Sequence, residues 1–312
     1  MRLGRNDADR PDAWGWVTAL GAFWGLSVAA AKVSLSSGMD PVLFAVCETA
    51  VITVLTSAVV FFGRIRFAVD RNRVSLWLVN GVFVVVIPYL ISYTALTKLT
   101  AGEVTVVLAL APVLTSILAI VVHLEKWSYL TTVGTVVSLA GVMVVASTAR
   151  GDGTPTTGGL GHGAWVCIAA LSPLCYAIAN VYVVSRSPRT ARAPVANVLG
   201  TNAVGCALLT LVLVVMVAAG QMSLANIDLT PALTYLMIAA LANASANLLF
   251  FIAARRTSAS VLAVSGYLTT LFGIMFGIVI ARDQWSPSLA LGGALVVAGV
   301  VIGTWRQTTK DQ

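Results

Sequence analysis

The chain has 312 residues, of which 58% are hydrophobic and only 10% are charged, with a formal net charge of +7. Soluble domains carry about 25% charged residues, so this composition excludes a soluble protein and indicates an integral membrane protein. A net positive charge also suits nucleic-acid binding, and the placement of the basic residues along the chain decides between the two interpretations.

Ten apolar segments have the length of about 20 residues that crosses a hydrocarbon core about 30 Å thick. They cover residues 14–34, 41–62, 75–97, 101–122, 129–148, 162–184, 194–218, 231–254, 258–280 and 287–305. The sequence therefore predicts an all-α integral membrane protein with ten transmembrane helices. The polar residues 1–13 are followed directly by a span, so we expect no cleavable signal peptide.

Basic residues gather in the loops on one side of these spans. With the N-terminus inside, the outside loops hold only Lys32, Lys98, Arg150 and Arg282 of the 19 Lys and Arg residues. The positive-inside rule then places both termini in the cytoplasm, and we expect a multi-pass protein of the plasma (inner) membrane. The basic excess is a topology signal, so nucleic acid is not an expected partner.

Residues 92–142 recur as residues 250–300, at a constant shift of 158 positions and with 12 identities in 51 pairs. Each half of the chain holds five spans, an odd number, so the halves should have opposite orientations, as an inverted 5+5 repeat. The expected organisation is a cytoplasmic tail 1–13, a first five-helix repeat 14–148, an external linker 149–161, a second five-helix repeat 162–305 and a cytoplasmic tail 306–312.

Several short motifs occur in the same order in both halves. The first half has Phe23-Trp24-Gly25, Tyr93 to Leu96, Thr100-Ala101, Ala111-Pro112, Glu125, Gly134 and Gly141; the second has Tyr176-Ala177, Ala253, Ser258-Ala259, Asp283, Gly292 and Gly299. This set resembles the EamA-type branch of the drug/metabolite transporter superfamily. The resemblance implies a cavity between the repeats, lined mainly by helices 3, 4, 8 and 9, and favours export. The chain departs from the family at Glu48, where an arginine is frequent, and at Thr270, where the first repeat keeps Pro112.

Acidic residues inside spans are costly, at about 2.5–3.5 kcal/mol each, and two of them lie well inside apolar segments. Glu48 lies seven residues into the second span, about 10 Å from its outer end. It is either a cavity acid that binds a proton or cation, or a structural partner of Lys32. Glu103 lies in the first turn after Thr100, where capping of the helix is the favoured interpretation and a cavity position the alternative.

Glu125 and Asp283 precede the fifth and tenth spans by three to four residues. Each is expected to accept hydrogen bonds from the free N–H groups of the helix that follows, helped by Ser128 and Ser286. We therefore interpret both acids as helix caps.

The remaining candidates for substrate binding are polar or aromatic side chains within spans. They are Trp24, Tyr89, Ser92, Tyr93, Tyr176, Asn180, Asn243, Asn247 and Tyr267. Asn243 and Asn247 are four residues apart and share one helix face. Such groups either join helices through hydrogen bonds or line a cavity. Pro88 should kink the third span, and the paired glycines should allow close helix packing.

The sequence thus predicts a secondary transporter that exports a small organic metabolite or an amino acid by alternating access, with a small-molecule substrate and the lipid bilayer as partners. Glu48 is the candidate for proton coupling. Multidrug efflux is one alternative, and a non-transporting membrane scaffold or sensor is another. We expect no catalytic site, metal or cofactor, because the spans lack clustered His, Asp and Cys residues and the chain has no phosphate-binding loop motif. A monomer or weak homodimer is expected.

Overall fold

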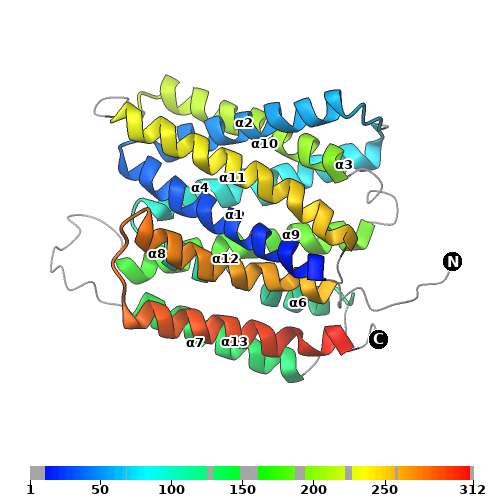
Figure 1. Cartoon of the computed structure of the whole chain (residues 1–312), viewed down its shortest axis with the longest axis vertical. Coiled ribbons are helices and arrows are strands. Elements are labelled where there is room, and N and C mark those ends of the chain that lie inside the picture. Colours follow the sequence, from blue (N-terminus) through cyan, green and yellow to red (C-terminus); the bar gives the residue numbers. More distant parts are fainter. Residues whose placement is uncertain are drawn as a thin grey trace.

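The computed structural model describes residues 11–67, 69–124, 129–147, 161–186, 194–221, 227–256 and 259–309, and helix is the only regular secondary structure in them. The helices are α1 (Pro11–Ser36), α2 (Pro41–Phe62), α3 (Arg71–Asn80), η2 (Gly81–Val86), α4 (Ile87–Leu96), α5 (Ala101–Leu108), α6 (Ala111–Val121), α7 (Tyr129–Ala146), α8 (His162–Ala169), α9 (Leu171–Arg186), α10 (Pro194–Ala218), α11 (Leu229–Arg256), α12 (Ala259–Val279) and α13 (Pro287–Thr309). They lie side by side in one bundle (Figure 1).

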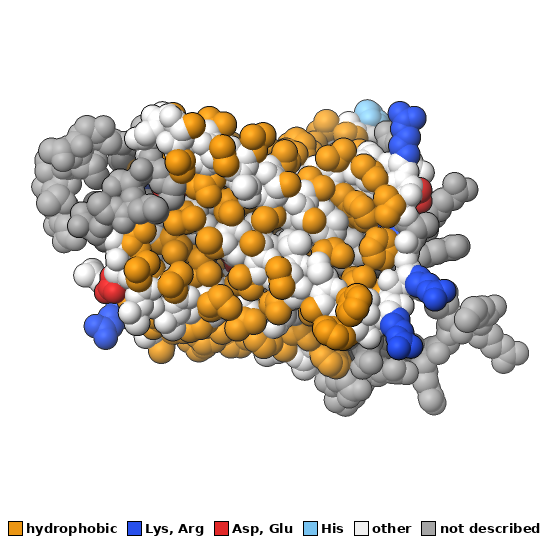
Figure 2. Space-filling model, turned by 90° about the horizontal axis from the view of Figure 1, so that it is seen from above, with side chains coloured by type: hydrophobic (Ala, Val, Ile, Leu, Met, Phe, Trp, Pro, Cys, Tyr) orange, Lys and Arg blue, Asp and Glu red, His pale blue; other side chains and the backbone are white. Residues whose placement is uncertain are grey.

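These helices occupy the ten predicted segments to within a few residues. Eight helical segments are long and apolar enough to cross a membrane, and α12 and α13 contain the shorter apolar stretches Ser265–Val279 and Pro287–Ile302 within the described residues. Figure 2 shows hydrophobic side chains across the middle of the visible face and charged side chains at its two ends. A bilayer requires this distribution. The chain is therefore a multi-pass membrane protein, and the number of ten spans stays a prediction.

Proline explains where two predicted spans break into pieces. Pro88 has no backbone N–H, and the chain forms the wider π-helical turn η2 directly before it. Pro112 is the second residue of α6, which follows a turn after α5, whereas its counterpart Thr270 lies inside the unbroken α12. The hydroxyl of Thr270 donates to the carbonyl oxygen of Thr105 on α5 at 3.3 Å. The repeats thus differ at the position where the proline differs.

Close glycine contacts join α7 to α13 along one edge of the bundle (Figure 1). A Cβ atom at Gly141 would lie 2.6 Å from the carbonyl oxygen of Gly292, and one at Gly299 would meet the backbone of Gly134. Glycine is therefore required for this approach. Because residue numbers rise on one helix as they fall on the other, the two helices run antiparallel.

A second pair of corresponding segments, α5 and α12, also packs antiparallel. Gly277 approaches Ala101 near the start of α5, and Gly273 approaches Thr105 one turn further along α5. Corresponding parts of the two repeats thus run in opposite directions where they meet, which agrees with the predicted inverted repeat; the inverted repeat itself stays a prediction.

Candidate functional site

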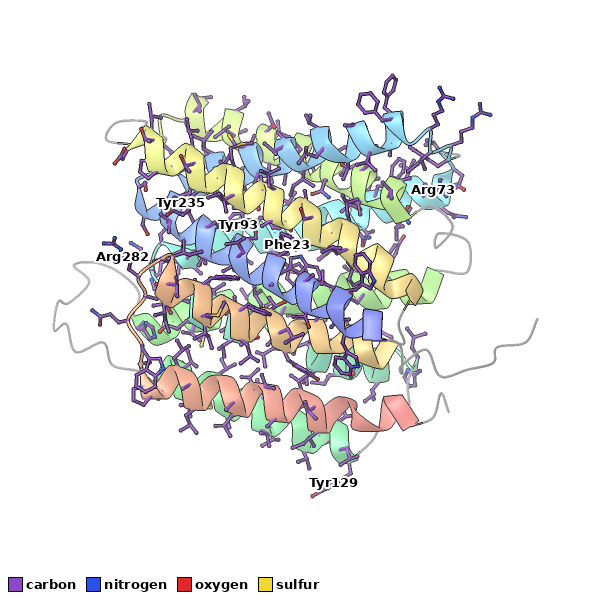
Figure 3. All side chains as sticks on the ribbon, in the orientation of Figure 1. Phe23, Arg73, Tyr93, Tyr129, Tyr235 and Arg282 are labelled. Atoms are coloured by element: carbon purple, nitrogen blue, oxygen red, sulfur yellow. The ribbon has the colours of Figure 1, made fainter. Side chains whose placement is uncertain are left out.

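The most buried acidic group of the described residues is the carboxylate of Glu48, whose side chain has no exposed surface. Tyr93 of α4 donates its hydroxyl hydrogen to Oε2, and the Nδ2 atom of Asn243 on α11 donates to Oε1 at 3.1 Å. Ser27 of α1 is a further hydrogen-bond neighbour. Three helices of the first repeat and one of the second therefore meet at this carboxylate, and Tyr93 lies inside the bundle in Figure 3.

Asn243 extends this cluster in two directions. Its Nδ2 atom also donates to the hydroxyl oxygen of Tyr89 at 2.9 Å, and its Oδ1 atom accepts from Nδ2 of Asn247 at 3.2 Å. Both hydrogens and the oxygen of the Asn243 side-chain amide thus take part in hydrogen bonds. The ring of Tyr89 packs 5.0 Å from that of Tyr93, and Tyr176 of α9 lies close enough to interact electrostatically with Glu48. We call Glu48, Tyr89, Tyr93, Asn243 and Asn247 the polar cluster.

The polar cluster brings together five of the predicted candidates, and others lie in separate contacts. The hydroxyl of Ser92 donates to that of Ser172 at 2.9 Å, and Asn180 donates to Thr115 at 3.3 Å from an exposed position. The ring of Trp24 lies 6.0 Å from that of Phe250. Tyr267 is partly buried against the hydrophobic core.

Glu103 caps the helix in which it lies. Its Oε2 atom accepts from the backbone N–H of Thr100 at 2.7 Å, and its own N–H donates to the hydroxyl of Thr100 at 3.1 Å. This reciprocal pair is a capping box, which the sequence favoured. The other carboxylate oxygen lies 3.3 Å from Nε2 of His162. The carboxylate of Glu103 is buried between a backbone N–H of its own helix and the side chain of His162 on α8.

Asp283 was predicted to cap the helix that follows it, and this prediction was wrong. Oδ2 of Asp283 accepts from the backbone N–H of Ala101 at 2.7 Å, so it caps α5 of the other repeat. Ser286 caps α13 as expected, accepting from the N–H of Leu289 at 3.1 Å. Asp283 lies four residues before α13, beyond the reach of its first N–H groups, and Gly277 leaves room for the carboxylate beside α5.

The surroundings of Asp283 shift its pKa in two opposite directions. Burial raises the pKa of Asp283, while hydrogen bonds from the N–H groups of Ala101 and Gly102 and the charge of Lys32 lower it. Lys32 itself donates to the carbonyl oxygen of Leu96 at 2.6 Å. The predicted caps Glu125 and Ser128 lie outside the described residues.

One residue beside Glu48 and one contact between the repeats were not predicted from the sequence. Ser27 is one small polar residue in an apolar span and carries no periodic signal. The contact of Asp283 with α5 joins residues 182 positions apart, and no local pattern reveals it. Lys32, considered as a partner of Glu48, instead contacts Leu96 and acts on Asp283.

Comparison with known proteins gives the class and the family. The fold resembles that of a solved crystal structure with a TM-score of 0.62 and 20% identity, over 93% of this chain and 96% of that chain, which shows a shared fold. Curated protein sequences give no significant match. The profile of the EamA-like transporter family matches twice, at residues 13–147 and 163–305. The protein is thus a multi-pass membrane protein built from two similar units. It belongs to the EamA-like transporter family, part of the drug/metabolite transporter superfamily.

Proposed function

We propose that this protein is a secondary transporter that exports a small organic metabolite or an amino acid by alternating access. The observation that carries the proposal is the buried carboxylate of Glu48, held by side chains from both repeats. Substrate sites of repeat-based transporters lie at the repeat interface. Ionisable groups buried within spans are expensive and characteristically mark ion or substrate pathways.

The chemistry of the polar cluster suits a substrate with an amino group. An ammonium group or a proton would replace the neutral donors Tyr93 and Asn243 at the carboxylate of Glu48 and would offset the cost of the buried charge. The amides of Asn243 and Asn247 would then be free to bind the carbonyl or carboxylate end of the same molecule. An amino acid or an aminated metabolite carries both kinds of group.

Alternating access requires contacts between the repeats that break and re-form. The antiparallel packing of α5 against α12 supports an inverted arrangement around the polar cluster. The contact of Asp283 with Ala101 joins the repeats at one end of this packing. With both termini in the cytoplasm and the protein in the plasma membrane, this end faces outward. Asp283 and Ala101 would separate when the substrate leaves.

Counterflow in proteoliposomes tests this function. We would load vesicles with amino acids, aliphatic amines or lipophilic cations in turn and measure exchange of the labelled compound. The proposal expects saturable exchange of an amino acid or aminated metabolite, and loss of that exchange in Glu48→Gln. Glu103→Gln is the matched control, because glutamine preserves a capping box. Exchange restricted to lipophilic cations would indicate multidrug efflux, and no exchange by correctly folded protein would contradict transport.

A further inference from the structure

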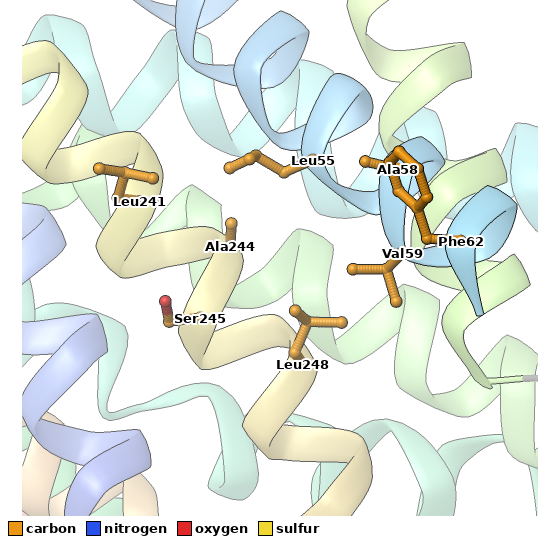
Figure 4. Close-up of a pocket in the computed structure, with 8 residues that line it drawn as sticks. All are labelled: Leu55, Ala58, Val59, Phe62, Leu241, Ala244, Ser245 and Leu248. Carbon is orange, nitrogen blue, oxygen red and sulfur yellow. The ribbon is translucent and has the colours of Figure 1, made fainter.

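A groove separate from the polar cluster runs between α2 and α11 (Figure 4). Its volume is about 430 Å³, and each helix contributes four side chains at the spacing i, i+3, i+4 and i+7. This spacing means that one face of each helix lines the groove. The lining is apolar except for Ser245.

The groove exists because small side chains stand between larger ones. Ala58 and Ala244 lie in its middle, with Leu241 toward one end and Phe62 toward the other (Figure 4). The side chains of Phe62 and Leu241 are 80% and 47% exposed, so the groove opens to the outside of the bundle. Its length along α2, from Leu55 to Phe62, is about 10 Å.

Positive charge lies directly beyond the Phe62 end. α2 ends at Phe62, and the exposed residues Arg64 and Arg66 follow it. Arg64 has a φ of 49°, so the backbone turns away from the helix axis at this point. The acidic residue of the same loop, Asp70, already caps α3 by accepting from the N–H of Arg73 at 2.8 Å. An anion at this end would therefore meet two guanidinium groups.

We propose that this groove, together with Arg64 and Arg66, binds an anionic phospholipid from the cytoplasmic leaflet. One acyl chain lies between Ala58 and Ala244, and the phosphate contacts the arginines at the membrane surface. Basic residues at the cytoplasmic end of transmembrane helices attract anionic lipids at about 1 kcal/mol each, and guanidinium groups match phosphate in geometry. The charge selects the head group, and the groove holds the chain.

A lipid at this place would act on the polar cluster. Leu55 lies seven residues after Glu48 on α2, and Ala244 directly follows Asn243 on α11. The lipid would therefore fix the spacing of the two helices that are joined by the 3.1 Å hydrogen bond between Asn243 and Glu48. The proportion of anionic lipid would then influence the conformational cycle.

Native mass spectrometry of delipidated protein, titrated with phosphatidylglycerol or phosphatidylcholine, tests the proposal without relying on transport. We expect tighter binding of phosphatidylglycerol and a loss of about 30-fold in the double variant Arg64→Gln/Arg66→Gln, equivalent to about 2 kcal/mol. Arg282→Gln, at the opposite end of the bundle, is the charge control and should bind like the wild type (Figure 3).

Filling the groove tests the position of the acyl chain. Ala58→Trp should weaken binding of both lipids, whereas Ala140→Trp, at an exposed position on α7, should not. Equal affinity for the two lipids, or unchanged binding in the arginine or Ala58 variants, would overturn the proposal. Cross-linking of Ala58→Cys between two copies of the chain would also overturn it, because a homodimer would then occupy the groove.

Discussion

Glu48 and Glu103 are both buried carboxylates in the first repeat, but only Glu103 accepts from a backbone N–H of its own helix. That contact persists as long as the helix exists, and the second carboxylate oxygen lies 3.3 Å from Nε2 of His162. Glu48 accepts from side chains on α4 and α11, which a substrate, a proton or a helix movement can exchange. Burial alone therefore does not mark a functional acid; the kind of partner does.

After the loss of exchange expected in Glu48→Gln, the largest effect on transport is expected at Asn243. Asn243→Ala removes a donor from Glu48 and leaves a buried charge less well satisfied, at about 1–3 kcal/mol. Transport rates in proteoliposomes should fall by roughly tenfold to a hundredfold. Asn202→Ala is the matched control, since the side chain of buried Asn202 donates to the carbonyl oxygen of Val198 in its own helix at 2.9 Å. Equal losses in both variants would contradict a special role for Asn243.

The next largest effect is a loss of stability at the contact between Asp283 and Ala101, which joins the repeats. Asp283→Ala leaves the N–H of Ala101 without its acceptor, and loss of such a cap costs about 0.5–2 kcal/mol. The midpoint of thermal unfolding in detergent should fall accordingly. Arg282→Ala, at the exposed neighbouring position, should leave the midpoint unchanged. If Asp283→Ala unfolds like the wild type, the cap is not a stabilising contact.

Smaller effects are expected at the edge of the polar cluster. Asn247→Ala and Tyr89→Phe each remove one hydrogen bond with Asn243, worth about 0.5–1.5 kcal/mol, and Tyr89→Phe keeps the ring that packs against Tyr93. Both should change the apparent substrate affinity without loss of membrane expression. Wild-type kinetics in both variants would remove these residues from the binding site.

The smallest effect is expected at Glu103. Glu103→Gln keeps an acceptor for the N–H of Thr100, so stability and transport should both stay close to the wild type. Glu103→Ala loses that acceptor and should lower the unfolding midpoint while leaving the substrate affinity unchanged. A change of affinity in either variant would place Glu103 in the cavity and would break the comparison with Glu48.

The hydrophobic pattern predicted the helices because its signal is local. The capping box of Thr100 and Glu103 was predictable for the same reason, as was a departure from regular α-helix near Pro88, which takes the form of the π-helical turn η2. The partner of Asp283 was not predictable, because it depends on the packing of α12 against α5 and on the space beside Gly277. The polar cluster was predictable as a set of residues, but the hydrogen bonds that centre it on Glu48 depend on how four helices meet.

The most direct test of the account is the pH dependence of exchange in proteoliposomes between about pH 5 and pH 8. Wild-type protein, Glu48→Gln and Glu103→Gln would be compared at equal amounts of reconstituted protein. The account predicts that exchange by the wild type and by Glu103→Gln varies with pH in the same way, and that Glu48→Gln gives a low rate that does not vary. A wild-type pH dependence retained in Glu48→Gln would contradict the assignment of Glu48 as the exchangeable site between the repeats.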